Sequence, residues 1–351
     1  MKKMFAGLLA AVMVISLAAC GNKQSDGTAT QSNGAKAQAE QIVLRWNEVN
    51  GDGYGATEGA KAFKAKLEEV SSGAMTIDLF TNGTLGDEKE SMQGIQMGTL
   101  DIFRGNASSL PNYGAETIGL TGLPFMFKDM EQFKAMADSS LGQEMLDSVD
   151  AADCGYVALG WLVEGPRQMF ITQKAYQKLG KPTEFTLDMM KGLKIRVPET
   201  DLMVSTMDAL GASATPIAYA ELYTSLQSGV VDGAENGVTS YVANSFNEVA
   251  PYFITDAHTF GCGVILMNKD KWNSLTDEQK GWMNEAAKAA SAACYDFNAK
   301  QEQEVFDSFV CLCGKQINCG YRADDMRSHG LVHKHGRYSE QNYYKSNDPW
   351  V

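Results

Sequence analysis

Short apolar runs alternate with helix-forming segments in the first third of the chain, and this alternation restricts the fold most. Apolar runs at 42–46, 75–80 and 100–103 predict strands, and segments 54–71 and 87–97 between them have the spacing of amphipathic helices. Gly73 and Gly98 follow these segments, where a left-handed helix cap is expected. Strands that alternate with helices are usually parallel and joined by crossovers, so the sequence predicts an α/β fold.

The rest of the chain continues this pattern and includes one long helical segment. Runs at 156–162, 169–172, 193–197 and 261–268 predict strands, and segments 202–210 and 220–228 predict helices. Thr276 and Gln279 form a capping box at the start of a helix-compatible stretch that extends to about residue 309. A helix of roughly 30 residues would be about 45 Å long, which exceeds one lobe. It therefore either bridges two lobes or is a kinked or broken pair of helices.

The first 40 residues have the pattern of an export signal and a tether. Lys2 and Lys3 precede an apolar run at 5–18 that is too short to span a bilayer comfortably. A lipobox-like sequence at 17–20 predicts cleavage after residue 19 and lipidation of Cys20; a plain signal peptide with a chance cysteine is the alternative. Residues 20–40 are polar and rich in Gly, Ser and Thr, as in flexible tethers. These features predict an extracytoplasmic protein, lipid-anchored at the periplasmic or outer face of the cell membrane.

The charge balance restricts the partners. The chain carries 43 Asp and Glu against 30 Lys and Arg, a net charge of −13, and an acidic chain repels phosphate backbones. We therefore expect no nucleic-acid partner. An apolar content of 44% is enough to build the cores of two lobes.

A glycine-rich motif follows the first predicted strand. Gly51, Gly53 and Ala56 match the dinucleotide-binding fingerprint, and Asp78 matches its ribose-binding acid. One interpretation is an exported, doubly wound oxidoreductase. The other is a helix N-terminus whose amides bind any anionic or hydroxylated ligand. The export signal favours the second interpretation, because soluble dinucleotides are largely intracellular, so we expect no cofactor.

The sequence lacks the usual signatures of a catalytic or metal site. There is no G-x-S-x-G, H-E-x-x-H or P-loop sequence, and His258 is the only histidine before residue 329. We interpret His258 as a satisfied polar residue near a turn. We expect neither catalytic residues nor a metal, and hence a protein that is not an enzyme.

Two arginines lie in or beside apolar strands. Arg196 is in the strand at 193–197, and Arg167 follows a turn beside another strand. A buried guanidinium needs an anionic partner. That partner is either an acid of the same chain or a ligand carboxylate held by a two-bond clamp. Position alone does not separate these alternatives.

Several motifs resemble one family. The sequences ALGASATPI at 209–217 and ELYTSLQSGVVDGAEN at 221–236 strongly resemble the DctP-type solute receptors of TRAP (tripartite ATP-independent periplasmic) transporters. LGDE at 85–88, LPFMF at 123–127 and KGLKIR at 191–196 resemble further hallmarks of these receptors, in the same order. The resemblance extends from about residue 42 to about residue 310.

This resemblance implies a two-lobe, periplasmic-binding-protein-like α/β fold of type II-like topology. Each lobe is expected to be a mixed sheet flanked by helices, with a long helix that spans both lobes. We expect lobe I at 41–164 plus 256–290, and lobe II at 165–255 plus 291–351. Such receptors close on an organic acid and deliver it to membrane permease subunits. We expect a monomer, and service to a membrane sensor is the alternative to service to a permease.

The resemblance also implies which residues bind the ligand. Arg196 is expected to pair with the ligand carboxylate, Arg167 to support or share it, and Asn236 to complete the site. The opposite lobe is expected to bind the rest of the ligand, although each of its residues has a solvated or capping role as the alternative. The further candidates are Tyr219 and, in the opposite lobe, Glu48, Asn50, Tyr54, Glu88, Arg104 and Asn106.

Two short sequences narrow the expected ligand. FRGN at 103–106 together with GAEN at 233–236 most resembles receptors for hexuronates and related sugar acids. The resemblance thus implies a hexuronate such as glucuronate or galacturonate, or a related aldonate. A C4-dicarboxylate or another organic acid is the alternative.

The C-terminal tail departs from the family pattern. From residue 311 onward the chain contains Cys311, Cys313 and Cys319 and three of its four histidines, where family members usually have a further helix. A zinc site is one interpretation, but no standard zinc-module spacing fits. A diverged tail is the preferred interpretation.

Overall fold

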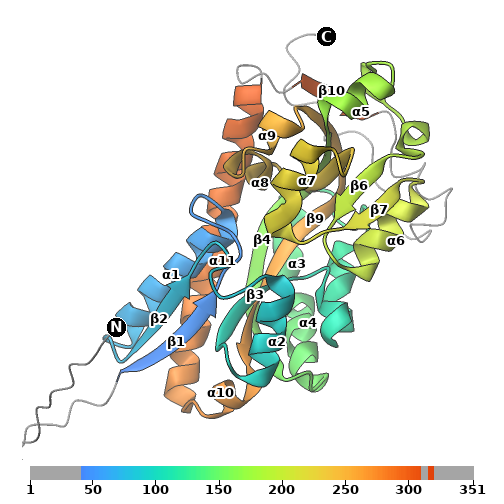
Figure 1. Ribbon diagram of the computed structural model, residues 1–351. Coiled ribbons are helices and arrows are strands. Elements are labelled where there is room, and N and C mark those ends of the chain that lie inside the picture. Colours follow the sequence, from blue (N-terminus) through green and yellow to red (C-terminus); the bar gives the residue numbers. More distant parts are fainter. Residues whose placement is uncertain (1–40, 310–314, 320–351) are drawn as a thin grey trace, which may run out of the picture. The chain divides into compact units, whose positions relative to one another are not determined.

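A mixed sheet forms the centre of the molecule. The computed structural model describes residues 41–309 and 315–319. Eight strands follow the order β2-β1-β3-β9-β4-β8-β6-β7, and β10 pairs with β5 and β9 (Figure 1). The strands are β1 Ile42–Asn47, β2 Met75–Phe80, β3 Ile102–Asn106, β4 Tyr156–Ile171, β5 Glu184–Phe185, β6 Lys194–Val197, β7 Ser213–Pro216, β8 Gly233–Gly237, β9 Tyr252–Asn268 and β10 Lys315–Cys319.

Helices occupy the segments between most of these strands. The α-helices are α1 Gly55–Val70, α2 Glu88–Met97, α3 Met130–Ala137, α4 Ser140–Ala151, α5 Gln173–Lys178, α6 Asp201–Ala209, α7 Leu222–Ser228, α8 Val238–Ala243, α9 Phe246–Val249, α10 Lys269–Asn273 and α11 Asp277–Phe309. The 3-10 turns are η1 Leu110–Tyr113, η2 Glu116–Gly122, η3 Leu187–Met190 and η4 Tyr219–Glu221. Among the described residues, no helix is long and apolar enough to cross a membrane.

Strand direction confirms only part of the expected parallel pattern. β1 is parallel to β2 and β3, and β6 is parallel to β7 and β8, as alternating strands and helices predict. β9 instead runs antiparallel to β3 and β4, and β4 runs antiparallel to β8. The sheet is therefore mixed, as the family resemblance implied.

β4 and β9 are single long strands, so the prediction of separate strands at 156–162 and 169–172 and of a short strand at 261–268 was wrong. β4 has 16 residues and β9 has 17, and they pair along most of their length. Register shifts at Val163/Gly165 and Arg167/Met169 interrupt the ladder without ending it. Gly165 adopts a φ of 102°, which a glycine tolerates, and the bulge lets the strand continue past Pro166. Arg167 is thus inside a strand and does not follow a turn.

The third strand is shifted relative to the prediction of 100–103. β3 covers Ile102–Asn106, which places Arg104 within the strand and Asn106 at its last position. The apolar run marks only the start of this strand. Arg104 continues it as a buried residue, since its guanidinium is paired inside the protein.

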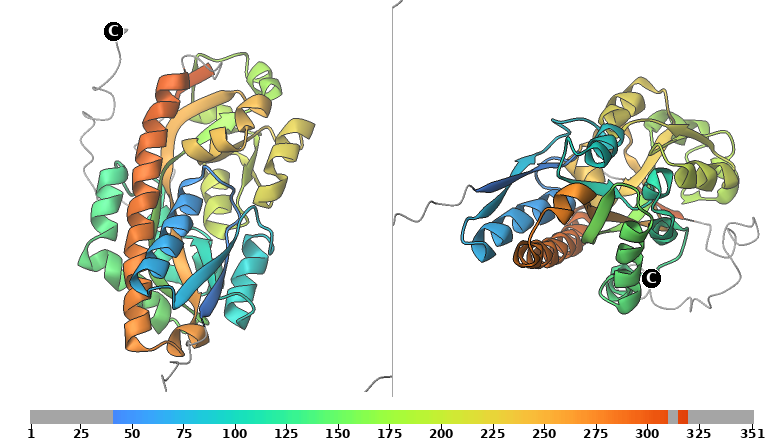
Figure 2. Two further views of the ribbon diagram at one scale, coloured as in Figure 1. Left: turned by 90° about the vertical axis from the view of Figure 1, so that its left-hand side faces the viewer. Right: turned by 90° about the horizontal axis from the view of Figure 1, so that it is seen from below.

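α11 is one continuous helix of 33 residues, so the alternative of a broken pair is wrong. Its start has the predicted capping box: the Thr276 hydroxyl accepts a hydrogen bond from the Gln279 amide, and the Gln279 side chain accepts one from the Thr276 amide. The helix packs against α1, β4 and α8 (Figure 2). It therefore contacts helices that follow β1 and β8, two strands on opposite sides of the β9–β4 pair.

Four hydrophobic clusters stabilise the sheet and its helices. The clusters around Trp46 and Phe133 lie on the β1–β3 side, and those around Ile195 and Phe170 lie on the β6–β8 side. Parallel strands on both sides end at the polar residues predicted for the site. Ligands of open α/β sheets bind beyond such carboxyl ends, which directs attention to the loops after β1, β3, β6 and β8.

Candidate functional site

A cleft of about 130 Å³ lies between residues that follow β1–β3 and residues in or after β6. Three of the predicted residues, Arg196, Glu88 and Tyr219, line it. Its other lining residues were not predicted as ligand-binding residues. They are Val49, Asn82, Gly83, Gly86, Asp87, Lys89, Ser109, Tyr113, Pro198, Glu199, Thr200, Ile217, Ala218 and Ala220.

Arg196 is a buried cation in the wall of this cleft. It lies in β6 with 2% of its surface exposed, and its Nε donates to the Ile217 carbonyl at 2.8 Å. Its guanidinium carbon is 5.9 Å from the centre of the Tyr219 ring. No acid of the described residues lies within ion-pair distance, and burial lowers the pKa of Arg196 to about 10. The cleft wall thus holds a guanidinium without an ion-pair partner among the described residues, and Glu235 and Glu88 favour its charge only from farther away.

Arg167 has the partner that Arg196 lacks. Its Nε and Nη2 donate to the two carboxylate oxygens of Glu235 at 2.6 and 2.8 Å, and both side chains are buried. Burial opposes the charged form, but Glu235 raises the pKa of Arg167 above its usual value. For Arg167, therefore, the internal acid is the observed partner, and Arg167 does not line the cleft.

His258 extends this buried charge cluster. It lies within β9, so its predicted place near a turn was wrong; Ala257 beside it has a φ of 41° where the β4–β9 register shifts. Its Nδ1 is 2.9 Å from Asp256 and its Nε2 is 3.5 Å from Glu235. Burial lowers its pKa, but the two carboxylates outweigh burial and raise the pKa of His258 to about 9. His258 is therefore a buried cation between two acids.

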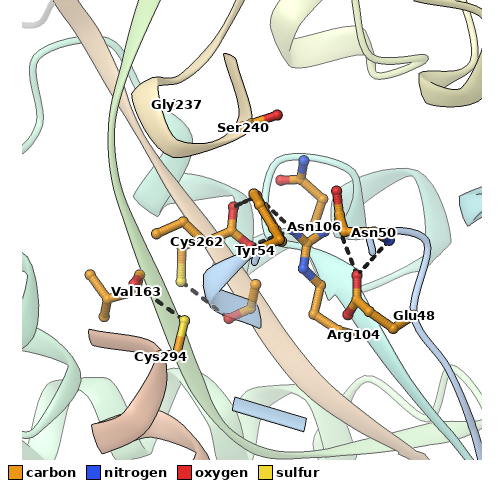
Figure 3. A network of polar contacts seen from close by, with 12 residues as sticks. Glu48, Asn50, Tyr54, Arg104, Asn106, Val163, Gly237, Ser240, Cys262 and Cys294 are labelled. Atoms are coloured by element: carbon orange, nitrogen blue, oxygen red, sulfur yellow. Dashed lines mark hydrogen bonds and ion pairs between the residues drawn. The ribbon is translucent and has the colours of Figure 1, made fainter. Parts of the chain in front are cut away.

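A second polar network surrounds the end of β3 (Figure 3). Arg104 forms a buried ion pair with Glu164, and its Nη2 also donates to the Tyr54 hydroxyl at 3.2 Å. The Tyr54 hydroxyl donates to Glu164 at 2.8 Å. The structure thus brings Tyr54 and Arg104 together, as predicted, but engages them with a partner that the sequence analysis missed. Glu164 lies at the β4 bulge, and no sequence signal indicated it as the partner of Arg104.

Glu48 and Asn50 lie beside this network (Figure 3). The Asn50 amide and side chain donate to Glu48 Oε1 at 3.1 and 2.7 Å. Burial raises the pKa of Glu48, although Arg104 and Asn50 oppose the shift. Glu48 Oε2 and Arg104 Nε are buried without a hydrogen-bond partner among the described residues. Neither Glu48 nor Asn50 lines the cleft.

Glu88 faces the cleft from the N-terminus of α2. Asp87 caps this helix, and the Asn106 amide and the Ser109 hydroxyl donate to Glu88 Oε1 at 3.1 and 2.5 Å. Its other carboxylate oxygen has no hydrogen-bond partner in the described part of the chain. Asn106 itself accepts hydrogen bonds from Ser108 through its side-chain oxygen. Glu88 is thereby held in place with one oxygen free to accept from a ligand.

Tyr219 lines the cleft on the β6–β8 side, and Asn236 lies in β8 outside the cleft lining. Asn236 is the fourth residue of β8, and its side-chain oxygen accepts from the Gly237 amide at 2.8 Å, which orients its amide group. The Tyr219 hydroxyl is within 2.7 Å of the Ser240 hydroxyl and accepts from Asn244 at 2.8 Å. These bonds fix the Tyr219 ring against Arg196.

The glycine-rich loop packs against the protein's own side chains. A Cβ at Gly51 would lie 2.5 Å from the Asn82 oxygen, and one at Gly55 would lie 2.2 Å from the Asn298 nitrogen. Gly53 has a φ of 82°, and its amide donates to Glu58 at 3.2 Å. A carboxylate of the chain therefore occupies the place that a phosphate would need, so the motif favours packing over dinucleotide binding.

Two predicted features lie outside what the structure describes. Cys20, the predicted lipidation site, is in the undescribed segment 1–40. The zinc interpretation of the tail rests on side chains that are likewise outside the described residues.

Comparison with known proteins identifies the family. The family described as bacterial extracellular solute-binding protein, family 7 (DctP), matches residues 46–318 of this chain. The chain belongs to the DctP family. A solute-binding protein of Chromohalobacter salexigens is 30% identical over 70% of this chain and 70% of its own. The C4-dicarboxylate-binding protein DctP of Rhodobacter capsulatus is 27% identical over 76% of this chain and 77% of its own.

Solved structures of TRAP periplasmic solute-binding proteins share the DctP fold described above. One from Xanthobacter autotrophicus, with bound β-D-galacturonate, has 28% identity and a TM-score of 0.74 over 82% of this chain and 91% of its own. One from a Bradyrhizobium species, in complex with galacturonate, has 29% identity and the same TM-score and coverage. The family membership, the mixed α/β fold and its long helix are therefore confirmed.

Proposed function

We propose that this DctP-family protein is the receptor of a TRAP transporter for a carboxylate-containing sugar acid, either a hexuronate or a related aldonate. The observation that carries the proposal is Arg196, a buried guanidinium without an acid partner among the described residues, in the wall of a cleft. A ligand carboxylate would supply the missing anion through a two-bond pair. Water excluded from the cleft would strengthen that pair.

Polar groups around the cleft fit the hydroxyl groups of a sugar acid. Glu88 offers a carboxylate oxygen as an acceptor, and Ser109 and Tyr113 line the same wall. Asn236 has an oriented amide that would donate to a carboxylate oxygen that Arg196 leaves free. Relatives that bind galacturonate support a hexuronate. The Rhodobacter relative, which binds C4-dicarboxylates, makes a dicarboxylate the competing ligand class.

The remaining predicted residues act behind this surface in our proposal. Arg167 binds Glu235 and so leaves Arg196 free for the ligand carboxylate. The hydrogen-bonded residues that stabilise the opposite wall are Tyr54, Glu48, Asn50 and Arg104. Lobe I would comprise 41–164 plus 256–290 and lobe II 165–255 plus 291–351. Closure of these lobes would trap the ligand, and permease subunits would receive it unchanged, so no catalysis is involved.

Anchoring completes the proposal. The export signal and Cys20 would place the receptor outside the cytoplasm and tether it, as a monomer, to the cell membrane. Mass spectrometry of the protein from its membrane fraction tests this step. A diacylated N-terminal Cys20 supports it, whereas a mature chain without lipid contradicts it.

Thermal melting across a ligand panel tests the proposed ligand class. The protein is first unfolded and refolded to remove bound ligand, and is then melted with hexuronates, aldonates and C4-dicarboxylates. We expect the melting temperature to rise with at least one sugar acid, because a ligand that binds only the folded state stabilises that state. No shift with any sugar acid would refute the proposal, and turnover of a sugar acid would favour the oxidoreductase alternative.

A further inference from the structure

We infer that this receptor accepts one carboxylate and rejects a second, with Glu88 as the residue that excludes it. The ligand would then be a sugar monoacid, and both aldarates and C4-dicarboxylates would bind poorly. This inference rests on the proposed function, since it concerns the same cleft. It rests on Arg196 in one wall of the cleft and on Asp87 and Glu88 in the facing wall.

Only one buried cation is available to a ligand in the described part of the chain. The buried cations are Arg104, Arg167, Arg196 and His258, and His258 lies between Asp256 and Glu235. Arg104 is paired with Glu164 and Arg167 with Glu235, each inside the protein. Because a buried ion pair that loses one partner is strongly destabilised, neither arginine is free to exchange its acid for a ligand. Arg196 therefore provides a single carboxylate site.

The facing wall is acidic where the far end of a ligand would lie. Asp87 and Glu88 line the cleft on this wall, and Glu199, which follows β6, adds a third carboxylate on the side of Arg196. Glu88 is held there by the Asn106 amide and the Ser109 hydroxyl. Its carboxylate accepts hydrogen bonds from hydroxyl groups but has no proton to donate to a second carboxylate. A sugar hydroxyl at this wall is therefore favoured over a carboxylate.

The pKa of Tyr113, which also lines the cleft, is raised by burial and by the negative charge of these carboxylates. Burial raises its pKa to about 12, and Glu88, Asp87 and Glu199 add to the shift. Each of these carboxylates disfavours another negative charge at the Tyr113 hydroxyl. Lys89 also lines the cleft, but its side chain is exposed, so solvent and salt screen its charge. Glu88 is half-buried, so its charge is screened less than that of Lys89.

Galactonate and galactarate provide a matched test. Both are open chains with the same hydroxyl configuration, and galactarate replaces the terminal CH₂OH of galactonate with a second carboxylate. Titration calorimetry of the refolded protein should show galactonate binding at least ~10-fold more tightly than galactarate. Galacturonate serves as the cyclic monoacid. If none of the three binds, the proposed function fails; if galactarate binds as well as galactonate, only this inference fails.

Glu88→Gln then tests the assigned residue. The substitution retains an acceptor oxygen and removes the charge. We therefore expect the ratio of the Kd for galactarate to the Kd for galactonate to fall at least ~3-fold. Glu131→Gln is the matched control, since loss of an exposed carboxylate outside the cleft lining should leave the preference unchanged. An unchanged preference in Glu88→Gln, or an equal change in Glu131→Gln, would overturn the assignment. Should Glu88→Gln fail to fold, raising the salt concentration with the unmodified protein gives the same test. Screening should narrow the preference, and a preference that does not change with salt would overturn the inference.

Discussion

Glu235 binds Arg167 with both carboxylate oxygens, at 2.6 and 2.8 Å, while Arg196 on the next strand of the sheet has no ion-pair partner in the part of the chain that the structure describes. Arg167 is in β4, Glu235 in β8 and Arg196 in β6, three neighbouring strands. Glu235 lies on the strand between those of the two arginines and, of these two, pairs with Arg167. The guanidinium of Arg196 is therefore the one available to a ligand.

Replacing Glu235 with Gln should destabilise the fold strongly. The change leaves Arg167 buried without its anion and removes one of the two acids beside His258. Loss of one partner of a buried ion pair should lower the free energy of unfolding by about 3–5 kcal/mol. Urea denaturation of the variant and the unmodified protein would measure this difference. Glu69→Gln is the control, because Glu69 pairs with Lys66 on the surface and its loss should cost less than ~1 kcal/mol. Equal effects of the two substitutions would contradict this account of the buried pair.

Stability should decrease with rising pH through the titration of His258. The pKa of His258 is raised from 6.5 to about 9 in the folded state, so its contribution is fully present below pH 6.5 and is lost as the pH rises through 9. The pKa of Glu235 is lowered from 4.5 to about 2, so its contribution is present above pH 4.5 and is lost as the pH falls through 2. Together these groups predict maximal stability between pH 4.5 and 6.5.

The His258→Gln variant isolates this effect. Urea unfolding at pH 6 and pH 9.5 should show a loss of stability in the unmodified protein, on the order of 1–3 kcal/mol. The variant should be less stable at pH 6 and should change less between the two pH values. A variant with the same pH dependence as the unmodified protein would show that other groups cause the loss.

Gly55→Ala should destabilise the protein through Asn298. An added Cβ would lie 2.2 Å from the Asn298 nitrogen, which donates to the Val163 carbonyl at 3.1 Å. Moving this buried side chain should cost about 1–3 kcal/mol in lost hydrogen bonding, although alanine is otherwise the better helix former. A double-mutant cycle with Asn298→Ala measures the coupling by thermal or urea unfolding. In the Asn298→Ala background, Gly55→Ala should be neutral or stabilising, and an unchanged cost there would exclude Asn298 as the cause.

Local signals in the sequence predicted many of the elements. The strand at Met75–Phe80, the capped helix α2 and the end of α11 at Phe309 follow from apolar spacing, capping residues and glycine stops. The long strands β4 and β9 were not predicted whole. Gly165, Pro166 and His258 look like interruptions in a sequence, whereas in the structure register shifts and buried charges accommodate them.

The candidate site was predicted less completely than the fold. The sequence indicated Arg196 and Arg167 but not which of them has an internal acid, because Glu235 is 68 residues from Arg167 and meets it only through strand pairing. The same holds for Arg104, whose partner Glu164 is 60 residues away. Ser109 and Tyr113 belong to loops without periodicity, so no sequence signal indicated them. Charge pairing across a sheet depends on register, which a single sequence does not reveal.

Arg196→Lys tests the central claim most directly. Lysine keeps the charge but cannot form the planar two-bond pair with a carboxylate. Titration calorimetry with the tightest-binding sugar acid, on refolded protein, should show 1:1 binding to the unmodified chain and at least ~10-fold weaker binding to the variant. Urea unfolding should confirm that both proteins are folded. Near-equal affinity of the two folded proteins would contradict the assignment of Arg196 as the residue that binds the ligand carboxylate.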